Sequence, residues 1–374
     1  MKCIRLYAMI RGKVGTGIMK KEVNNMKFTM DDTLQEILAD SFVDQYLDLT
    51  FQRGLLQMVA PVYYEKTIAF LAEKCRLLPL GLPFPAKEFL KAVNRLYDIK
   101  EGKYRIDYLW KEGEKEGLPD IRQSGKKKVC LISKAGEGKD KPAVIISPGG
   151  AYELLSCSFE GFEMADKMEE AGYRAFVLFY RVKPDLYPAP MQDIALAVKH
   201  IRKFANDYGI NPENVMCMGS SAGGHLSACL GAIPEVIEKE LTQELLKTDP
   251  EREKFYRGIS CKPDKLCLNY SVNSFMDPLL EPCFVNLAGE RMQELRSLLS
   301  PAEHVDENYP KCFLWACADD DLVPCKNTEE MAEKLKEAGV SCEVHIFPEG
   351  GHGRGLAEGS SAQEWPDRMI KFMK

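Results

Sequence analysis

Short apolar runs alternate with helical stretches from Lys126 to the C-terminus, and this alternation limits the possible folds more than any other feature of the chain. Strands that are apolar throughout, and that are separated by helices, form a mostly parallel sheet covered by helices on both faces. The sequence therefore predicts a doubly wound α/β domain, in which ligands bind at the carboxyl ends of the strands. The predicted strands are Val129–Ser133, Ala143–Ser147, Ala175–Tyr180, Val215–Met218, Leu266–Tyr270, Cys312–Cys317 and Cys342–Phe347.

The segments between these strands carry helical patterns. The highly charged stretch 236–260 is predicted to be a solvated helical insertion. The loops between Ser271 and Ser300 are expected to shape the pocket of the domain. The other predicted helices are Glu160–Ala171, Met191–Tyr208, Ser221–Ala232, Thr328–Ala338 and Glu364–Met373.

Residues 31–120 show a helical pattern throughout. Apolar residues recur at spacings of three and four over 34–49, which gives one apolar helix face. Two further helices are expected over Tyr64–Leu78 and Pro85–Tyr97. The segment carries no catalytic signature, so it is either an appendage packed on the α/β domain or a cap that shapes substrate access. The predicted division is a tail (1–30), a helical N-terminal extension or cap (31–125) and the α/β domain (126–374).

The first residues are basic and partly apolar, but Arg5 and Arg11 interrupt the apolar stretch and no small-residue cleavage site follows. They therefore do not form a signal peptide. The codons of Lys21–Met26 can contain a ribosome-binding sequence directly before a start codon. Residues 1–25 are therefore predicted to be untranslated leader before Met26, and the alternative is a basic disordered tail.

The composition excludes several classes of protein. The formal net charge of −6 leaves no basic excess for nucleic-acid binding as a main role. No apolar run approaches the ~18 residues that cross a bilayer. The 13 cysteines are scattered among apolar neighbours, without a CxxC pair or zinc-ligand spacing. Free thiols of this kind persist in a reducing compartment, which predicts a cytoplasmic protein without a metal site.

The stretch Gly219-Ser220-Ser221-Ala222-Gly223 matches the pattern G-x-S-x-G. A predicted strand leads into the motif and a predicted helix leads out of it, as in a nucleophile elbow. The flanking glycines allow the sharp turn that exposes a serine hydroxyl, so Ser221 is the candidate nucleophile. The alternative is that Ser221 only caps the following helix.

A serine nucleophile needs a base, and the chain contains 5 histidines. His352 lies in a glycine-rich loop after the last predicted strand, from which it can reach the elbow, so it is the candidate base. His345 lies within that strand and is expected to be a core residue. His225 follows the elbow on the same helix and is expected to pack locally against the sheet.

The acid partner of the histidine is expected to follow the penultimate strand, Cys312–Cys317. A carboxylate there would hold the imidazole tautomer and stabilise the imidazolium. The order along the chain is then serine, aspartate, histidine, which is the order of α/β-hydrolases and not that of chymotrypsin-like or subtilisin-like proteases. The register stays open among the three adjacent candidates Asp319, Asp320 and Asp321.

An oxyanion hole is expected directly after the strand Ala143–Ser147. Consecutive glycines at that point let backbone N–H groups face a developing oxyanion. The predicted donors are the N–H groups of Gly150, Ala151 and Ala222. Glu160 and Glu163 lie nearby in sequence, and they either contact substrate hydroxyls or are solvated or capping residues of their helix.

Residues from about 126 to 374 resemble the α/β-hydrolase superfamily, in particular bacterial esterases of the acetyl-esterase and acetylxylan-esterase-like kind. The resemblance implies an α/β-hydrolase fold, and it selects Asp320 as the acid because two residues and then Val-Pro follow the acid in that family. In that family the loop has a glycine at the position of Ala151. The change to alanine is tolerated if the φ angle of Ala151 is negative. The matching stretches are SPGGAYELLS, AGYRAFVLFYRV, YPAPMQDIALAVKHIR, NVMCMGSSAGGHLSA, FLWACADDDLVP and FPEGGHGRGL.

The resemblance implies a serine esterase that forms an acyl-enzyme and needs neither a metal nor an organic cofactor. Its expected substrates are small-molecule esters with short acyl groups, such as acetyl groups on sugars or xylo-oligosaccharides. Neither nucleic acid nor a membrane is expected as a partner, and the oligomeric state is open. One alternative is a serine peptidase of the prolyl-oligopeptidase type, although residues 1–125 are too short for its usual β-propeller. The other is a non-catalytic, hydrolase-like binding protein, which the intact set of site residues disfavours.

Overall fold

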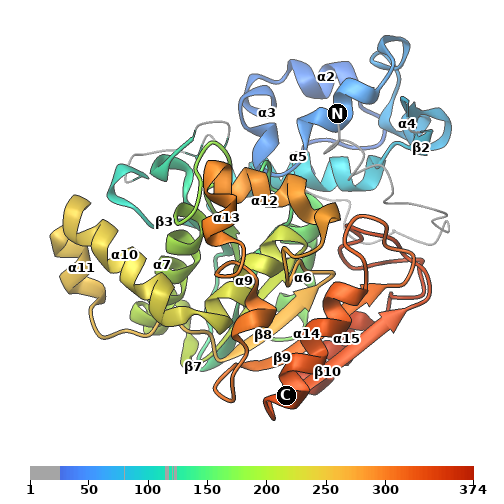
Figure 1. Cartoon of the computed structure of the whole chain (residues 1–374). Coiled ribbons are helices and arrows are strands. Elements are labelled where there is room, and N and C mark those ends of the chain that lie inside the picture. Colours follow the sequence, from blue (N-terminus) through green and yellow to red (C-terminus); the bar gives the residue numbers. More distant parts are fainter. Residues whose placement is uncertain (1–25, 80, 114–117, 120, 122–123) are drawn as a thin grey trace.

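An eight-stranded sheet runs through the centre of the molecule in the computed structural model (Figure 1). The structure describes residues 26–374 apart from 80, 114–117, 120 and 122–123, so the predicted leader 1–25 lies outside the described residues. The strand order is β10-β9-β8-β7-β5-β6-β4-β3. Neighbouring strands are parallel from β10 to β6, whereas β4 is antiparallel to β6 and β3 to β4. The strands are β3 (Tyr104–Tyr108), β4 (Cys130–Lys134), β5 (Lys141–Ser147), β6 (Arg174–Phe179), β7 (Ile210–Ser220), β8 (Lys265–Asn269), β9 (Lys311–Cys317) and β10 (Cys342–Phe347).

Helices cover both faces of this sheet, because successive strand residues point to opposite sides and nearly all are apolar. Methionines of α6 and α15 pack on one face, together with strand residues such as Ile146 and Trp315. Residues of α7, α9 and α14 pack on the other face, against strand residues such as Ile145 and Leu314. No helix in the described part of the chain has the length and apolarity to cross a membrane. The helices named are α6 (Glu163–Glu170), α7 (Ala189–Lys203), α9 (Ala222–Ala232), α14 (Lys326–Glu337) and α15 (Trp365–Met373).

All seven predicted strands are present, and the mostly parallel α/β fold is confirmed. The sequence predicts no strand in 31–120, and this is wrong at the short pair Arg76–Leu77 and Leu82–Pro83 and at Tyr104–Tyr108, which forms the edge strand β3. Arg105 and Asp107 alternate there with tyrosine and isoleucine, and every residue of the strand is half-buried. A short edge strand of this kind lacks the continuous apolar run by which the central strands are recognised. Because β3 pairs with β4, the predicted extension 31–125 contributes directly to the main sheet.

The N-terminal helices enclose a hydrophobic cluster of their own. The helix expected over 34–49 is broken at Asp40, whose carboxylate accepts hydrogen bonds from the N–H groups of the next helix. The helix predicted over Tyr64–Leu78 is shorter, because Thr67 caps its first turn and the chain extends again at Cys75. A two-stranded antiparallel pair follows, β1 (Arg76–Leu77) with β2 (Leu82–Pro83). The helices are α2 (Leu34–Ala39), α3 (Ser41–Tyr46), α4 (Ile68–Lys74) and α5 (Ala86–Lys100).

The charged insertion forms α10 (Pro234–Thr248) and α11 (Pro250–Tyr256), and α10 packs along α7. The expectation that it is solvated is wrong for one side of α10, where Ile237, Leu241 and Leu245 are buried. These residues recur at spacings of four, so one apolar stripe is covered while the charged side chains face outward.

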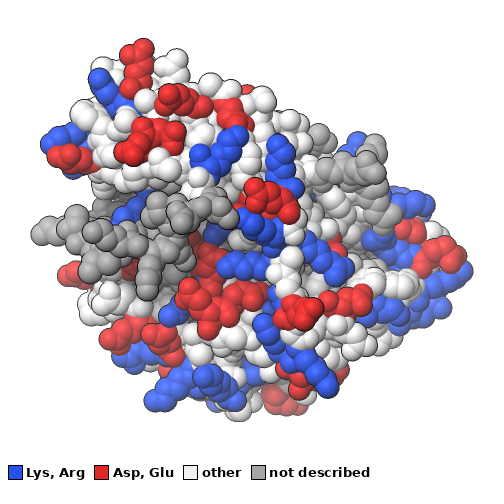
Figure 2. Space-filling view, turned by 180° about the vertical axis from the view of Figure 1, so that it is seen from behind, with Lys and Arg blue, Asp and Glu red and all other residues white. Residues whose placement is uncertain are grey.

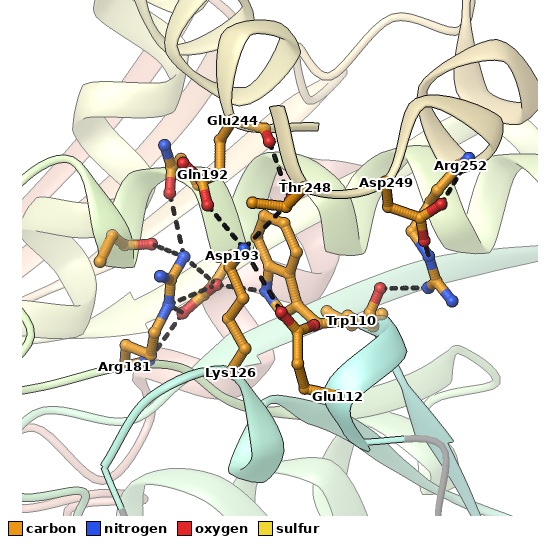
Figure 3. A network of polar contacts seen from close by, with 12 residues as sticks. Trp110, Glu112, Lys126, Arg181, Gln192, Asp193, Glu244, Thr248, Asp249 and Arg252 are labelled. Atoms are coloured by element: carbon orange, nitrogen blue, oxygen red, sulfur yellow. Dashed lines mark hydrogen bonds and ion pairs between the residues drawn. The ribbon is translucent and has the colours of Figure 1, made fainter. Parts of the chain in front are cut away.

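A polar network ties this insertion and helix α7 to the segment that precedes β4 (Figure 3). Asp193 of α7 is fully buried and accepts hydrogen bonds from the Trp110 indole, at 2.7 Å, and from the Arg181 guanidinium. Lys126 lies over the Trp110 ring and forms an ion pair with Glu244 of α10 at 2.6 Å. The buried charges of Asp193 and Arg181 are therefore paired, as a low-dielectric interior requires.

A polar hollow of about 1020 Å³ lies between α5, α6 and the segment after His352. Its lining carries both signs of charge, for example Lys87 and Lys91 of α5 and Glu163 of α6. Figure 2 shows that basic and acidic side chains are interspersed over the back of the molecule. The described residues visible in that view therefore form no broad basic patch of the kind that binds nucleic acid.

Candidate active site

Ser221 lies at the sharp turn between strand β7 and helix α9. Its backbone has φ 52° and ψ −120°, a strained conformation that is typical of a nucleophile elbow. Both flanking glycines are needed: a Cβ atom on Gly219 would lie 2.1 Å from the carbonyl oxygen of Gly223, and one on Gly223 would lie 2.0 Å from that of Ser147. The Ser221 hydroxyl caps no N–H group of the described helix α9, which contradicts the alternative that this serine is only an N-cap.

His352 connects Ser221 to Asp320 through two short hydrogen bonds. Its Nε2 atom lies 2.8 Å from Ser221 Oγ, and its Nδ1 atom lies 2.7 Å from Asp320 Oδ2. The three residues are at most 5% exposed, so water competes little for these contacts. The other oxygen of Asp320, Oδ1, accepts hydrogen bonds from the N–H groups of Leu322 and Val323 at 3.0 and 2.9 Å. The fold thus brings the three predicted residues together as hydroxyl, imidazole and carboxylate, in that order.

The other two aspartates of the same loop occupy different positions. Asp319 accepts hydrogen bonds from the N–H groups of Gly351 and Gly350, at 2.7 and 3.1 Å, and so holds the loop of His352. Asp321 is exposed. Both line a hollow of about 440 Å³ beside that loop. Within the described residues, no group of three or more His, Cys, Asp or Glu side chains is arranged to hold a metal ion.

The environment of His352 favours a protonated imidazole. Burial is the largest single influence and lowers the pKa of this histidine, but the carboxylate of Asp320 and smaller contributions from Glu160 and Asp321 together raise the pKa above the ordinary value of 6.5. A carboxylate at Nδ1 also fixes the tautomer in which Nε2 carries the lone pair toward Ser221. The imidazole is therefore arranged to accept a proton from the serine hydroxyl.

His225 is also buried, but burial lowers its pKa to about 4, so it is neutral. Its Nδ1 atom lies 2.6 Å from the Tyr152 hydroxyl and its Nε2 atom 2.7 Å from the carbonyl oxygen of Leu299. It packs behind the loop that follows β5. His345, which the sequence predicts to be a core residue, is instead half-buried on the edge strand β10, with Nε2 at 2.6 Å from Glu343.

The loop Ser147–Tyr152 follows β5 and touches the elbow, since a Cβ atom on Gly149 would lie 2.9 Å from Cβ of Ser221. The condition under which alanine would replace glycine without strain, a negative φ at Ala151, is not met: the angle is 53°, in the left-handed region, which costs an alanine about 1 kcal/mol. Gly150 has φ 134°. No backbone carbonyl among the described residues accepts a hydrogen bond from the N–H groups of the three predicted donors, Gly150, Ala151 and Ala222.

Hydrogen bonds from distant elements hold the carbonyl groups of this loop. The Tyr180 hydroxyl donates to Pro148 O at 2.6 Å, and Asn286 Nδ2 donates to Ala151 O at 2.9 Å. Asn286 belongs to α12 (Glu281–Ala288), inside the segment that the sequence expected to shape the pocket. The strained φ at Ala151 therefore persists because partners on other elements hold the loop.

Two residues near the site are not singled out correctly by the sequence. Glu160, expected to be solvated, capping or in contact with substrate, is 3% exposed and accepts a hydrogen bond from the N–H of Gly149. Tyr270 packs its ring edge-on against His352, with 4.9 Å between the ring centroids. A signal for Tyr270 exists, because it directly follows β8, the neighbour of the elbow strand. Glu160 lies in a helical pattern and carries no such signal.

Comparison with known protein families decides where this site belongs. Residues 131–335 match the model of the BD-FAE family. The chain belongs to the BD-FAE family. The matched region runs from β4 into α14 and includes Ser221 and Asp320, whereas His352 lies beyond it.

Solved structures confirm the α/β-hydrolase fold of this BD-FAE protein. The acetyl ester-xyloside bifunctional hydrolase of Caldicellulosiruptor lactoaceticus is 31% identical, with a TM-score of 0.61, over 72% of this chain and 94% of that one. MGS-M1, an α/β hydrolase from a deep-sea metagenome library, is 24% identical with a TM-score of 0.52, over 69% of this chain and 95% of that one.

Curated relatives of the BD-FAE protein include enzymes of xylan breakdown. Endo-1,4-beta-xylanase B of Butyrivibrio fibrisolvens is 30% identical over 60% of this chain and 34% of its own length. The acetylxylan esterase of Xylanibacter ruminicola is 27% identical over 61% of this chain and 43% of its own length. The chain thus spans less than half of the length of these two relatives. The resemblance to acetylxylan-esterase-like proteins is confirmed at the level of the family.

Proposed function

We propose that this protein is a serine carboxylic-ester hydrolase in which Ser221 is the nucleophile, His352 the general base and Asp320 the residue that orients His352. The observation that carries the proposal is the continuous hydrogen-bonded chain from the Ser221 hydroxyl, at a strained elbow, through His352 to Asp320. The names of the relatives support it, because several are esterases or carboxylic ester hydrolases.

The reaction begins when Ser221 Oγ attacks the carbonyl carbon of the ester while His352 Nε2 takes the hydroxyl proton. The negative charge that develops on the carbonyl oxygen is held by the N–H groups of the predicted donors, Gly150, Ala151 and Ala222. Asp320 stabilises the imidazolium without taking its proton. His352 then gives that proton to the departing alcohol oxygen, which leaves an acyl group on Ser221.

The acyl-enzyme is resolved by the same groups in reverse roles. His352 Nε2 takes a proton from water, the water oxygen attacks the acyl carbon, and the bond to Ser221 Oγ breaks as the proton passes to that oxygen. The products are a carboxylic acid and the free enzyme. The step needs no electron acceptor or donor, since water supplies both the oxygen and the proton.

The proposed substrates are short-chain acyl esters, in particular acetyl esters of sugars or xylo-oligosaccharides. This part rests on similarity: one relative is named an acetylxylan esterase and one solved structure an acetyl ester-xyloside hydrolase. We also propose that the protein works in the cytoplasm, because the cysteines of the described chain are free thiols and most are buried.

The test is hydrolysis of p-nitrophenyl esters from acetate to octanoate, followed by acetylated xylo-oligosaccharides. The wild type is expected to be most active on acetate, and Ser221→Ala to lose turnover and labelling by a fluorophosphonate probe. Ser220→Ala is the matched control, because it removes the neighbouring buried hydroxyl and leaves the contact between Ser221 and His352 in place. A folded wild type that hydrolyses no ester and resists the probe would refute the proposal.

A further inference from the structure

The carboxylate of Glu160 is buried directly beneath the proposed site, and each of its oxygens has a separate partner. Oε2 accepts a hydrogen bond from the N–H of Gly149, at 3.0 Å, in the loop of the predicted oxyanion donors. Oε1 accepts one from the Tyr270 hydroxyl at 2.8 Å. The Ser156 hydroxyl is a further donor to this carboxylate. An acceptor with several donors in a site closed to water is bound in one orientation.

Tyr270 extends this contact to the loop that carries His352. Its hydroxyl accepts a hydrogen bond from the N–H of Gly355 at 3.1 Å, while it donates its own proton to Glu160. Its ring lies edge-on to the His352 imidazole, with 4.9 Å between the centroids. Glu160 therefore connects the loop after β5 with the loop after β10, two segments that are far apart in the sequence.

The backbone around Glu160 has an unusual helical conformation and lies close to the histidine loop. Residues Ser158–Phe162 form a π-helix that leads into α6, and π-turns of this kind are rare and frequently found at functional sites. The π-helix also touches the histidine loop, because a Cβ atom on Gly355 would lie 2.7 Å from the carbonyl oxygen of Phe159. Gly355 has φ 56°, so both its conformation and its surroundings require glycine.

We propose that Glu160 is a positioning residue. Its carboxylate fixes the position of the Gly149 loop directly, and that of the His352 loop through Tyr270, relative to Ser221. This inference rests on the proposed esterase function. It assigns Glu160 no proton transfer and no contact with substrate. Its contribution is the relative placement of the oxyanion donors and the base, which decides the rate because a displacement of about 1 Å can cost about 100-fold.

The charge of Glu160 also acts on His352. Burial raises the pKa of Glu160, and the hydrogen bonds from Tyr270 and Gly149 oppose that shift by favouring the carboxylate. The charged groups that raise the pKa of His352 against burial are Asp320, Glu160 and Asp321, and Tyr270 faces the ring as a neutral group. Removing the charge at Glu160 therefore lowers the pKa of His352, and the acid limb of kcat/KM moves to lower pH.

The test compares Glu160→Gln and Glu160→Ala with Glu163→Gln, which neutralises the next carboxylate along the chain, on the side that lines the polar hollow. Turnover is expressed per Ser221 titrated with a fluorophosphonate, so that a loss of folded protein does not count as a loss of rate. Glu160→Ala is expected to lower kcat by about 100-fold with little change in KM. Glu160→Gln keeps one acceptor and is expected to lose about tenfold. Glu163→Gln is expected to match the wild type.

A double-mutant cycle with Tyr270→Phe tests the connection itself. If Glu160 acts through Tyr270, the loss in the double variant Glu160→Ala/Tyr270→Phe is smaller than the product of the two single losses. If the two single losses multiply in the double variant, the inference is overturned. It is also overturned if folded Glu160→Gln and Glu160→Ala have the same kcat per titrated site and the same pH profile as the wild type.

A wild type without esterase activity would refute the proposed function but not, by itself, the role of Glu160. In that case the exchange of the Gly355 amide proton with solvent, followed by NMR, decides between the outcomes, because Gly355 donates to Tyr270 and not to Glu160. Faster exchange in Glu160→Ala and an unchanged rate in Glu163→Gln support the positioning role, and equal rates in the wild type and Glu160→Ala overturn it.

Discussion

The substitution Asp320→Asn tests how the carboxylate orients the imidazole, because the surroundings of Asp320 dictate which way an amide would point. Oδ1 accepts hydrogen bonds from the N–H groups of Leu322 and Val323. An asparagine must place its carbonyl oxygen there, since an amide nitrogen would meet two donors. The NH₂ group then faces His352 Nδ1, where the wild type has a carboxylate oxygen at 2.7 Å.

The consequence is that His352 adopts its other neutral tautomer. An NH₂ group donates, so Nδ1 must accept, and the single proton of the neutral imidazole moves to Nε2. Nε2–H then donates toward Ser221 Oγ and has no lone pair to take the serine proton. A change of this type is expected to lower kcat by about 10⁴-fold, which corresponds to about 5.4 kcal/mol of activation free energy.

The assay is kcat on p-nitrophenyl acetate per titrated site, with thermal unfolding to show that each variant is folded. Asp321→Asn is the matched control, because this exposed neighbour does not contact the imidazole, and its kcat is expected to stay within about twofold of the wild type, as is usual for surface substitutions. The assignment of Asp320 is refuted if folded Asp320→Asn retains a tenth or more of the wild-type kcat. It is also refuted if the kcat of Asp321→Asn falls as far as that of Asp320→Asn.

Three further predictions concern His352, Ala151 and Arg181. Because Asp320 raises the pKa of His352, kcat/KM in the free enzyme is expected to fall as pH drops through a value above 6.5; an acid limb below 6.5 would contradict this. Ala151→Gly relieves the left-handed φ of 53° and is expected to raise the free energy of unfolding in urea by up to about 1 kcal/mol, and a loss of stability would contradict it. Arg181→Ala leaves Asp193 buried without its cationic partner and is expected to cost about 3–5 kcal/mol in the same assay, with kcat per titrated site unchanged; a cost below about 1 kcal/mol would contradict the account of this pair.

The elements that the sequence predicts well are those whose signal is local. The seven predicted strands are recognised because apolar residues dominate each central one and alternate with Glu343 and His345 in the edge strand β10. The glycines around Ser221 mark the elbow because no other residue fits the turn. The edge strand β3 is not recognised, because two of its five residues, Arg105 and Asp107, are charged and its pairing with β4 is a long-range contact. The helix expected over 34–49 is interrupted for a local reason that periodicity does not weigh, the capping carboxylate of Asp40.

The sequence by itself determined the α/β class, the order of nucleophile, acid and base along the chain, and the loops in which each would lie. The tertiary structure alone decided their geometry: Ser221 and His352 are 131 positions apart and meet only because β7 and the loop after β10 end at the same edge of the sheet. It also decided that Ala151 is left-handed and that Glu160 is buried. The physical reason is common to these cases. A turn or strand follows from interactions between near neighbours, whereas the burial of a charge and the angle of a strained residue depend on partners brought in from distant parts of the chain.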